Sequence, residues 1–382
     1  MRVLDLSRLL PGPFCSLVLS DLGAQVDKLE DPGAGDYLRV FPPQVAALGA
    51  SGKFAALNRD KRSLCLDLKR PEGRAALLRL LPRYDVLLET FRPGVLDRLG
   101  LDGATLWAAH PRLVVCAISG YGADGPYRER AGHDLNYIGL AGLLAFAGPG
   151  DRPPPVPPVQ LADLAGGALT AAVGVLAALF DAQRSGRGRR VDVSMCEGSL
   201  GLILPPLGDL AAAGRLHPRG EEILTGGVAA YGVYRTKDDR FVTVGALEPK
   251  FWLAFCAALG RTAEPAELFA PREVQAKLRA ELQAILATKT RDEWAAVFAE
   301  VDACCEPLLE AKELADHPVH RARGTFVEVD GVRYAQTALH RLGGRATHTP
   351  APAQGRDSTA ILREGGFGDD EIAALRAGGV TR

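Results

Sequence analysis

The sequence predicts an α/β fold in which an open, largely parallel sheet is joined to a smaller α+β domain. Three observations support this prediction. Short apolar runs alternate with helical patterns over the first 120 residues, a proline-rich connector then leads into a long apolar helix, and hairpin signals begin after residue 220. At 382 residues, the chain is long enough for two domains.

The first part of the chain alternates β-like and helical segments. Strands that are separated by helices are typical of a parallel sheet with crossover connections, because parallel strands cannot be joined by a tight turn. We expect strands at residues 2–6, 26–29, 64–68, 85–89 and 113–119, with helices at residues 13–22 and 71–81.

The middle of the chain begins with a connector at residues 151–160, whose five prolines exclude regular helix or sheet. It leads into residues 164–180, which are rich in Gly and Ala, short for a bilayer, and followed by Asp181. We expect this segment to be a buried helix. A strand at residues 191–195 and a helix at residues 197–213 follow.

The pattern of the last part indicates a second, smaller domain and a final helical segment. A hairpin is expected from two β-like runs that flank residues 237–240, and another around Asp330 and Gly331. The predicted strands are residues 231–236 and 241–246, and the predicted helices are residues 249–259, 273–300 and 369–377.

The balance of charged residues excludes partners that would bind mainly through their own negative charge. Lys and Arg number 45 against 46 Asp and Glu, so neither nucleic acid nor an anionic membrane is favoured, and we expect a small-molecule partner.

Asp5 and Arg8 interrupt the start of the chain, which lacks the pattern of a secretory signal. The seven cysteines are scattered and odd in number, as in reduced core positions. We therefore expect a cytoplasmic protein.

Familiar cofactor and nucleophile motifs are absent. Gly33-Ala34-Gly35 lacks the third glycine of a dinucleotide loop, and Gly198-Ser199-Leu200-Gly201 only approaches a serine-nucleophile elbow. His317 and His320 have no carboxylate at metal-ligand spacing, so no metal site is predicted.

His133 lies between a loop rich in Gly and Pro, residues 120–126, and the apolar run at 138–146. This placement predicts a loop-to-helix junction, where unpaired N–H groups and the positive helix dipole favour an anionic intermediate. A histidine beside a helix start is more often structural than catalytic, and both roles stay open at this point.

Asp163 begins the predicted apolar helix, with Gly166 and Gly167 in its first turn, where a side chain would block close approach of a ligand or another backbone. It is either a helix N-cap or an acid, base or nucleophile, since apolar surroundings raise a carboxyl pKa and a helix N-terminus lowers it. Glu248 follows a predicted strand and precedes Pro249, which suits either a cap or a site carboxylate.

Positive side chains are concentrated in the first hundred residues, mostly in loops and at strand ends. Such a cluster favours phosphate groups, although a solvated surface would have the same composition. Its members are Arg39, Arg59, Lys61, Arg62, Lys69, Arg70 and Arg92.

These residues resemble, over nearly the whole chain, those of the 2-methylacyl-CoA racemases of the family III CoA-transferase superfamily. The superfamily resemblance comes from residues 10–15, 21–24, 61–64, 66–69, 85–89, 91–95 and 119–122. The resemblance to the racemase branch comes from residues 132–137, 162–167, 234–236 and 244–249. Residues 164–165 and 226–231 depart from the usual racemase pattern, which concerns substrate shape more than chemistry.

The resemblance implies that His133 and Asp163 are two acid/base residues on opposite faces of an acyl-CoA substrate, with Glu248 orienting His133. It implies coenzyme A as part of the substrate and no further cofactor. It also implies a Rossmann-like large domain built from both chain ends, residues 1–215 and 317–382, a small domain at 220–316, and an interlocked homodimer. The implied coenzyme A contacts are Arg39, Leu66, Asp67, Leu68, Lys69, Arg92, Gly132, Asp134, Asn136 and Tyr137.

Two other functions compete with racemisation. In a CoA-transferase, Asp163 would attack a thioester and carry the acyl group, and the presence of His133 and Glu248 argues against this alternative. A non-catalytic protein that only binds CoA thioesters is expected to have lost one of the three residues.

Overall fold

The computed structural model describes the backbone of residues 1–382 and every side chain except that of Ala47. The chain divides into two compact units. The larger unit comprises Met1–Ala141, Pro157–Leu204 and Pro318–Arg382, and the smaller comprises Gly142–Val156 and Pro205–His317. Residues 142–156 and 205–215, which the sequence placed with the large domain, group with the smaller unit.

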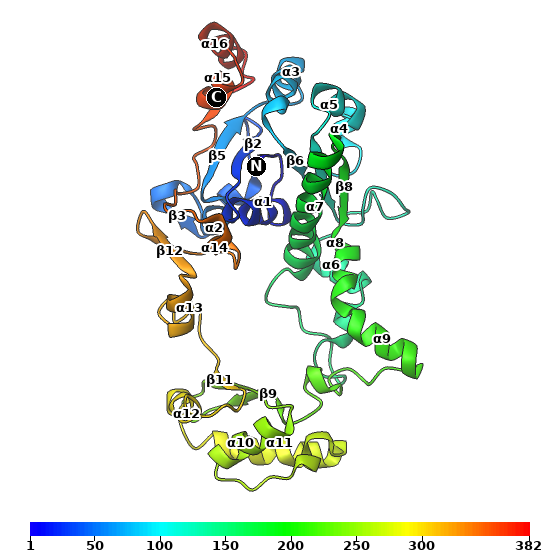
Figure 1. Cartoon of the computed structure of the whole chain (residues 1–382), viewed down its shortest axis with the longest axis vertical. Helices are drawn as coiled ribbons and strands as arrows, with labels where there is room; N and C mark the ends of the chain where they lie inside the picture. Colours follow the sequence, from blue (N-terminus) through cyan, green and yellow to red (C-terminus); the bar gives the residue numbers. More distant parts are fainter. The chain divides into compact units, whose positions relative to one another are not determined.

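The larger unit contains a six-stranded parallel sheet in the order β5-β2-β1-β6-β7-β8 (Figure 1). This is the strand order of a doubly wound Rossmann-like fold, which confirms the predicted α/β class. The strands are β1 (Arg2–Asp5), β2 (Gln25–Glu30), β5 (Lys61–Cys65), β6 (Val86–Glu89), β7 (Val114–Ser119) and β8 (Arg190–Ser194).

Helices cover both faces of this sheet. One face packs on α3, α5 and α15 through a leucine-rich core that includes Leu4, Leu64 and Leu87. The other face contacts α1 and α7. The helices of the larger unit are α1 (Pro11–Asp21), α2 (Gly52–Asn58), α3 (Pro71–Leu80), α4 (Val95–Arg98), α5 (Gly103–Ala109), α6 (Asp134–Leu140), α7 (Thr170–Ser185), α8 (Met195–Leu200), α13 (Pro318–Arg323), α14 (His340–Gly343), α15 (Ser358–Glu364) and α16 (Asp369–Ala377).

Two short ribbons and several helical turns complete the larger unit. The ribbon of β12 and β13 confirms the hairpin expected around Asp330 and Gly331. The ribbons are β3 (Gln44–Val45) with β4 (Ala50–Ser51) and β12 (Phe326–Val329) with β13 (Val332–Ala335), and the turns are η1 (Tyr37–Val40), η2 (Ala46–Leu48), η3 (Leu81–Arg83), η6 (Gly201–Ile203) and the π-helix η5 (Ala162–Leu169).

The smaller unit has its own antiparallel sheet in the order β11-β10-β9, covered by helices around Trp252 and Trp294. The predicted hairpin is the pair β9 and β10. Its elements are β9 (Tyr231–Arg235), β10 (Phe241–Gly245), β11 (Cys305–Pro307), α10 (Pro249–Ala258), α11 (Arg272–Leu286), α12 (Arg291–Phe298), η4 (Leu143–Phe146), η7 (Ile223–Thr225), η8 (Pro265–Phe269) and most of α9 (Leu204–Ala213).

The strand predicted at residues 64–68 lies three residues earlier, at Lys61–Cys65. Lys61 is fully buried at the start of this strand because Asp5, Ser16 and Asn58 bind its ammonium group. A buried charged side chain gives no apolar signal, so the sequence pattern pointed to the apolar residues that follow.

The helix predicted to be buried at residues 164–180 is exposed along one side. It runs over Ala162–Ser185 and leaves Leu169, Val173, Leu176 and Phe180 in contact with solvent. It is also the one helix in the described structure that is long and apolar enough to cross a membrane, a criterion that core helices of water-soluble proteins also meet.

Candidate active site

The order of the sheet marks where a ligand binds in such a fold. Consecutive connections run from β1 toward β2 on one side, and the chain returns to β6 on the other side of β1. In doubly wound sheets, ligands bind outside the carboxyl ends of the strands at this reversal point. The loops after β1 and β6 meet there, since the main-chain N–H of Arg8 donates to Thr90 Oγ1 at 3.2 Å.

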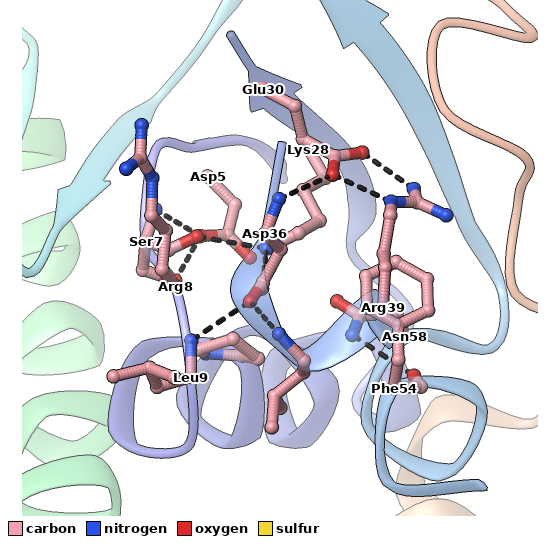
Figure 2. A network of polar contacts seen from close by, with 12 residues as sticks. Asp5, Ser7, Arg8, Leu9, Lys28, Glu30, Asp36, Arg39, Phe54 and Asn58 are labelled. Atoms are coloured by element: carbon pink, nitrogen blue, oxygen red, sulfur yellow. Dashed lines mark hydrogen bonds and ion pairs between the residues drawn. The ribbon is translucent and has the colours of Figure 1, made fainter. Parts of the chain in front are cut away.

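A buried ionic network supports the loop after β1 (Figure 2). Leu9 has a left-handed backbone with φ 63°, and its N–H donates to Asp36 Oδ1 at 3.2 Å. The Asp36 carboxylate pairs with Lys28 at 2.9 Å, and both side chains are fully buried. Lys28 also donates to Ser7 O at 2.8 Å, so the pair ties both ends of the strained turn to β2.

Arg39, a predicted coenzyme A contact, belongs to the same network (Figure 2). Its side chain makes two hydrogen bonds to Glu30, at 2.6 and 2.8 Å, and a third to Pro352 O at 3.1 Å. Its guanidinium also lies 3.9 Å from the ring centroid of Phe54. All three guanidinium nitrogens therefore donate within the protein, and a contact with coenzyme A stays a prediction.

The basic residues of the first hundred positions do not form one surface cluster. Arg59 and Lys61 are buried, and Arg59 pairs with Asp21 and Asp60 at 2.7 Å. Burial of the Lys61 ammonium lowers its pKa to about 8, more than the attraction of Asp5 can offset. Carboxylates inside the protein bind both cations, so neither role suggested by the sequence, phosphate contact or solvated surface, applies to them.

Five other predicted coenzyme A contacts lie in the loops after β5 and β6, and the remaining four lie at the start of α6. After β5, Leu66 and Leu68 are buried in the core, and the N–H of Asp67 donates to Val380 O at 2.9 Å. Lys69 and Arg92 are exposed, the first in this loop and the second in the loop after β6. These two cations are therefore accessible to an anionic group.

His133 occupies the N-cap position of α6, which confirms the predicted loop-to-helix junction. Its backbone N–H donates to Asn136 Oδ1 at 3.0 Å, and the residue is exposed. The first N–H groups of a helix have no carbonyl acceptor within the helix, so those of Asp134 and Leu135 remain for an external acceptor.

Tyr137 anchors the loop that carries His133. Its hydroxyl donates to Gly132 O at 2.5 Å, and its ring packs edge-on against Tyr121 at 5.1 Å between centroids. A side chain at Gly132 would lie within 2.7 Å of the Tyr137 ring, which explains the glycine. Burial raises the pKa of Tyr137 to about 12, and the charge of Arg92 opposes this rise.

Asp163 lies in the first turn of η5, where the N-cap position belongs to Leu161. The simple cap suggested by the sequence is therefore wrong. The cap comes from Asp134, whose Oδ1 accepts from the N–H groups of Ala162 and Asp163 at 2.6 and 3.0 Å. Burial and, secondarily, the charge of Asp134 raise the pKa of Asp163 to about 7. Both of its protonation states are therefore populated near neutral pH.

A glycine contact sets the distance between η5 and α8. A Cβ atom on Gly198 would lie 2.0 Å from the main-chain oxygen of Gly166, and one on Gly166 would lie 2.5 Å from Ser199 Oγ. Sequence reasoning noted that Gly166 would permit close approach of a backbone. It missed that the backbone is that of Gly198, which entered only as part of a rejected serine motif.

Glu248 belongs to the smaller unit, at the N-cap position of α10, and its side chain is exposed. Burial raises the pKa of the Cys304 thiol, and the charge of Glu248 adds to this rise. The orientation of His133 by Glu248 stays a prediction.

A hollow of about 470 Å³ lies beside α6 and α8. Its wall is mostly apolar, with one carboxylate. It is lined by Tyr121, Tyr127, Leu140, Ala141, Ser194, Cys196, Glu197 and Leu200. No group of three or more metal-ligating side chains occurs among the residues that the structure describes.

Comparisons with known proteins agree with this architecture. The family model of CoA-transferase family III matches residues 1–358. The alpha-methylacyl-CoA racemase of Homo sapiens is 37% identical over 99% of this chain and 95% of its own length. The succinyl-CoA–D-citramalate CoA-transferase of Chloroflexus aurantiacus is 32% identical over 99% and 96%.

A solved structure is also similar. A CAIB/BAIF family protein from Brucella suis superimposes with a TM-score of 0.82 at 27% identity, over 96% of this chain and 98% of that one. The fold and these similarities define an enzyme of the CoA-transferase and racemase type. The chain belongs to CoA-transferase family III.

Proposed function

We propose that this protein racemises 2-methylacyl-CoA thioesters by moving the α-proton between two acid/base residues, His133 and Asp163. The observation that carries the proposal is the state of Asp163, whose pKa is raised to about 7. A residue that must accept a proton in one direction and donate it in the other works best when its pKa is near the working pH. A carboxylate nucleophile would not need this property.

In the proposed mechanism, one base removes the α-proton and the C–H electron pair moves into the thioester as an enolate. The other residue, protonated, then delivers a proton to the opposite face. For the second enantiomer the roles of His133 and Asp163 are exchanged. This two-base transfer balances without an external acid, base or redox partner.

The first turn of α6 supplies the enolate with stabilisation. The N–H groups of Asp134 and Leu135 follow His133 directly and lie at the positive end of the helix. In a site that excludes water, a hydrogen bond aimed at a developing negative charge typically stabilises the transition state by about 3–4 kcal/mol. A thioester oxygen placed against this turn would have its α-carbon beside the imidazole.

Coenzyme A is proposed to lie across the loops after β1, β5 and β6, at the reversal point of the sheet. Lys69 and Arg92 are exposed in these loops and can pair with phosphate groups. The acyl chain is not specified by any contact in the structure. We propose no separate cofactor.

The proposal includes a cytoplasmic location and a homodimer. The homodimer is supported by the exposed side of Ala162–Ser185, where Val173 and Phe180 are 69% and 63% exposed. Leu169 and Leu176 continue the same stripe at helical spacing, and an unpartnered apolar stripe marks an interaction surface.

CoA transfer is the second candidate, and the similarity to transferases favours it. In that reaction Asp163 attacks the thioester carbonyl and CoA leaves as thiolate, which gives a mixed anhydride. The thiolate then attacks the aspartyl carbonyl, which releases the donor acid and leaves an aspartyl-CoA thioester. An acceptor carboxylate attacks this thioester, and the thiolate that leaves takes the acceptor's acyl group from the second mixed anhydride, which frees Asp163. This reaction depends on an acceptor acid, whereas racemisation does not.

Proton NMR of a single enantiomer of 2-methylacyl-CoA in D2O separates these functions. With no added acid, we expect loss of the α-proton signal and of optical purity, and His133→Ala or Asp163→Ala should abolish exchange or confine it to one enantiomer. No exchange, but CoA transfer on addition of a carboxylic acid, would assign the protein as a transferase.

A further inference from the structure

Asp134 connects the two residues that the proposed function uses as bases. It follows His133 directly in α6, and its carboxylate accepts hydrogen bonds from Ala162 and Asp163 in η5. The two hydrogen bonds, at 2.6 and 3.0 Å, converge on one oxygen, Oδ1. Twenty-nine residues of sequence separate Asp134 from Asp163, so this contact is a product of the tertiary fold.

The contact is more than a replaceable helix cap. The N-cap residue of η5, Leu161, has no side-chain acceptor, so the cap must come from elsewhere. A local Ser, Thr or Asp at position 161 would cap the helix equally well without any link to α6. By placing the acceptor on Asp134, the chain ties the N-terminus of the Asp163 helix to the N-terminus of the His133 helix.

Electrostatics makes the link chemically relevant. The Asp134 carboxylate lies close enough to Asp163 to raise its pKa, after burial, which is the larger cause. The other titratable group on α6, Tyr137, is also coupled to Asp163, and Arg92 acts on that tyrosine. The remaining titratable groups on elements packed against η5 do not shift Asp163: Cys15 and Asp21 of α1, Asp181 and Arg184 of α7, Cys116 of β7, Arg190 and Asp192 of β8, and Cys196 and Glu197 of α8.

We propose that Asp134 is a positioning residue, whose carboxylate joins α6 to η5 by two hydrogen bonds, sets the spacing of His133 and Asp163, and acts on Asp163 through its negative charge. The inference rests on the proposed racemase function and adds a residue to it. The hydrogen bonds perform the first task and the negative charge performs the second. The two tasks separate because Asn keeps an acceptor oxygen and loses the charge, whereas Ala loses both.

The test is the pH dependence of α-proton exchange for each enantiomer in wild type, Asp134→Asn and Asp134→Ala. In Asp134→Asn, the limb of the profile that belongs to Asp163 should move to lower pH, with turnover at the optimum within several-fold of wild type. In Asp134→Ala, kcat should fall roughly a hundredfold with little change in KM, because a shift of about 1 Å between reacting groups costs that much.

Asp102 offers a matched control in the same unit. It caps α5, a helix of the leucine-rich core, by accepting from the N–H of Thr105 at 2.8 Å. Asp102→Ala should lower thermal stability, Asp102→Asn should change it little, and both should leave the pH profile in place. A profile that moves equally in the Asp102 variants, or that stays unchanged in Asp134→Asn, would overturn the proposal.

A second readout separates this inference from the proposed reaction. Carbon-13 NMR of the aspartate carboxyl groups follows the titration of Asp163 directly, with Asp163→Asn identifying the signal. A lower titration midpoint in Asp134→Asn is expected whatever the reaction is. An unmoved midpoint would refute the role of Asp134, whereas absent α-proton exchange in wild type would refute the racemase alone.

Discussion

Substituting Gly198 by alanine should move the helix that carries Asp163. The contact between Gly198 and Gly166 joins two backbones, and the new Cβ atom would lie 2.0 Å from the Gly166 oxygen. Real Cβ atoms essentially never approach closer than 3.0 Å, so the backbones must separate by at least 1.0 Å, the difference between these two distances. Neither partner is a flexible side chain end, so the separation must move η5 or α8.

The magnitude follows from this displacement. Overpacking of a close contact typically costs about 1–3 kcal/mol. For a unit of this size, we therefore expect the Tm to fall by about 2–12 °C. The active site should suffer more than the fold, because a shift of about 1 Å in a reacting group costs roughly a hundredfold in rate.

The assay pairs calorimetry with α-proton exchange and uses Gly201→Ala as the matched control. Gly201 lies three residues further along the chain, has φ −56°, and its Cβ would meet nothing within 4 Å. Alanine there should leave exchange unchanged and raise stability by up to about 1 kcal/mol. A Gly198→Ala variant with the Tm and exchange rate of wild type would refute the packing argument.

Three further perturbations test other parts of the structure. Because the pKa of Asp163 is raised in the folded protein, its contribution to stability is present below about pH 4 and is lost as the pH rises through about 7. Urea unfolding should therefore show that wild type loses stability relative to Asp163→Asn between about pH 4 and 7, and a difference that stays constant would contradict this prediction. Lys28→Met leaves the buried carboxylate of Asp36 unpaired and should lower the free energy of unfolding by about 3–5 kcal/mol, most of which Asp36→Asn should restore. If the two substitutions instead lower stability additively, this reasoning is wrong. The double variant Val173→Asp and Phe180→Asp should dissociate the proposed homodimer and halve the mass measured by light scattering. A wild-type protein that is already a monomer would refute the proposed dimer.

Local signals explain why much of the fold is predictable from the sequence. Five β-like runs separated by helical patterns match β1, β2, β5, β6 and β7, with a three-residue error only where Lys61 is buried. The position of His133 at a helix start was also predictable, because a Gly-rich loop precedes it and an apolar run follows. These features depend on neighbours within a few residues.

The resemblance to a known family predicts roles for His133 and Asp163 that their positions in the sequence left open. Position alone left each residue between a structural and a catalytic role. The tertiary structure adds the reason that Asp163 differs from an ordinary surface aspartate, namely burial next to Asp134.

Contacts between distant residues were beyond the reach of sequence patterns. Three such contacts each join residues at least 28 positions apart: the cap that Asp134 provides to η5, the close approach of Gly198 to Gly166, and the hydrogen bond from Arg39 to Pro352. Helix and strand periodicities describe which face of an element is apolar, but they do not say which other element will cover it. Only packing determines which charged groups lose water, and with it which carboxyl group acquires a pKa near neutrality.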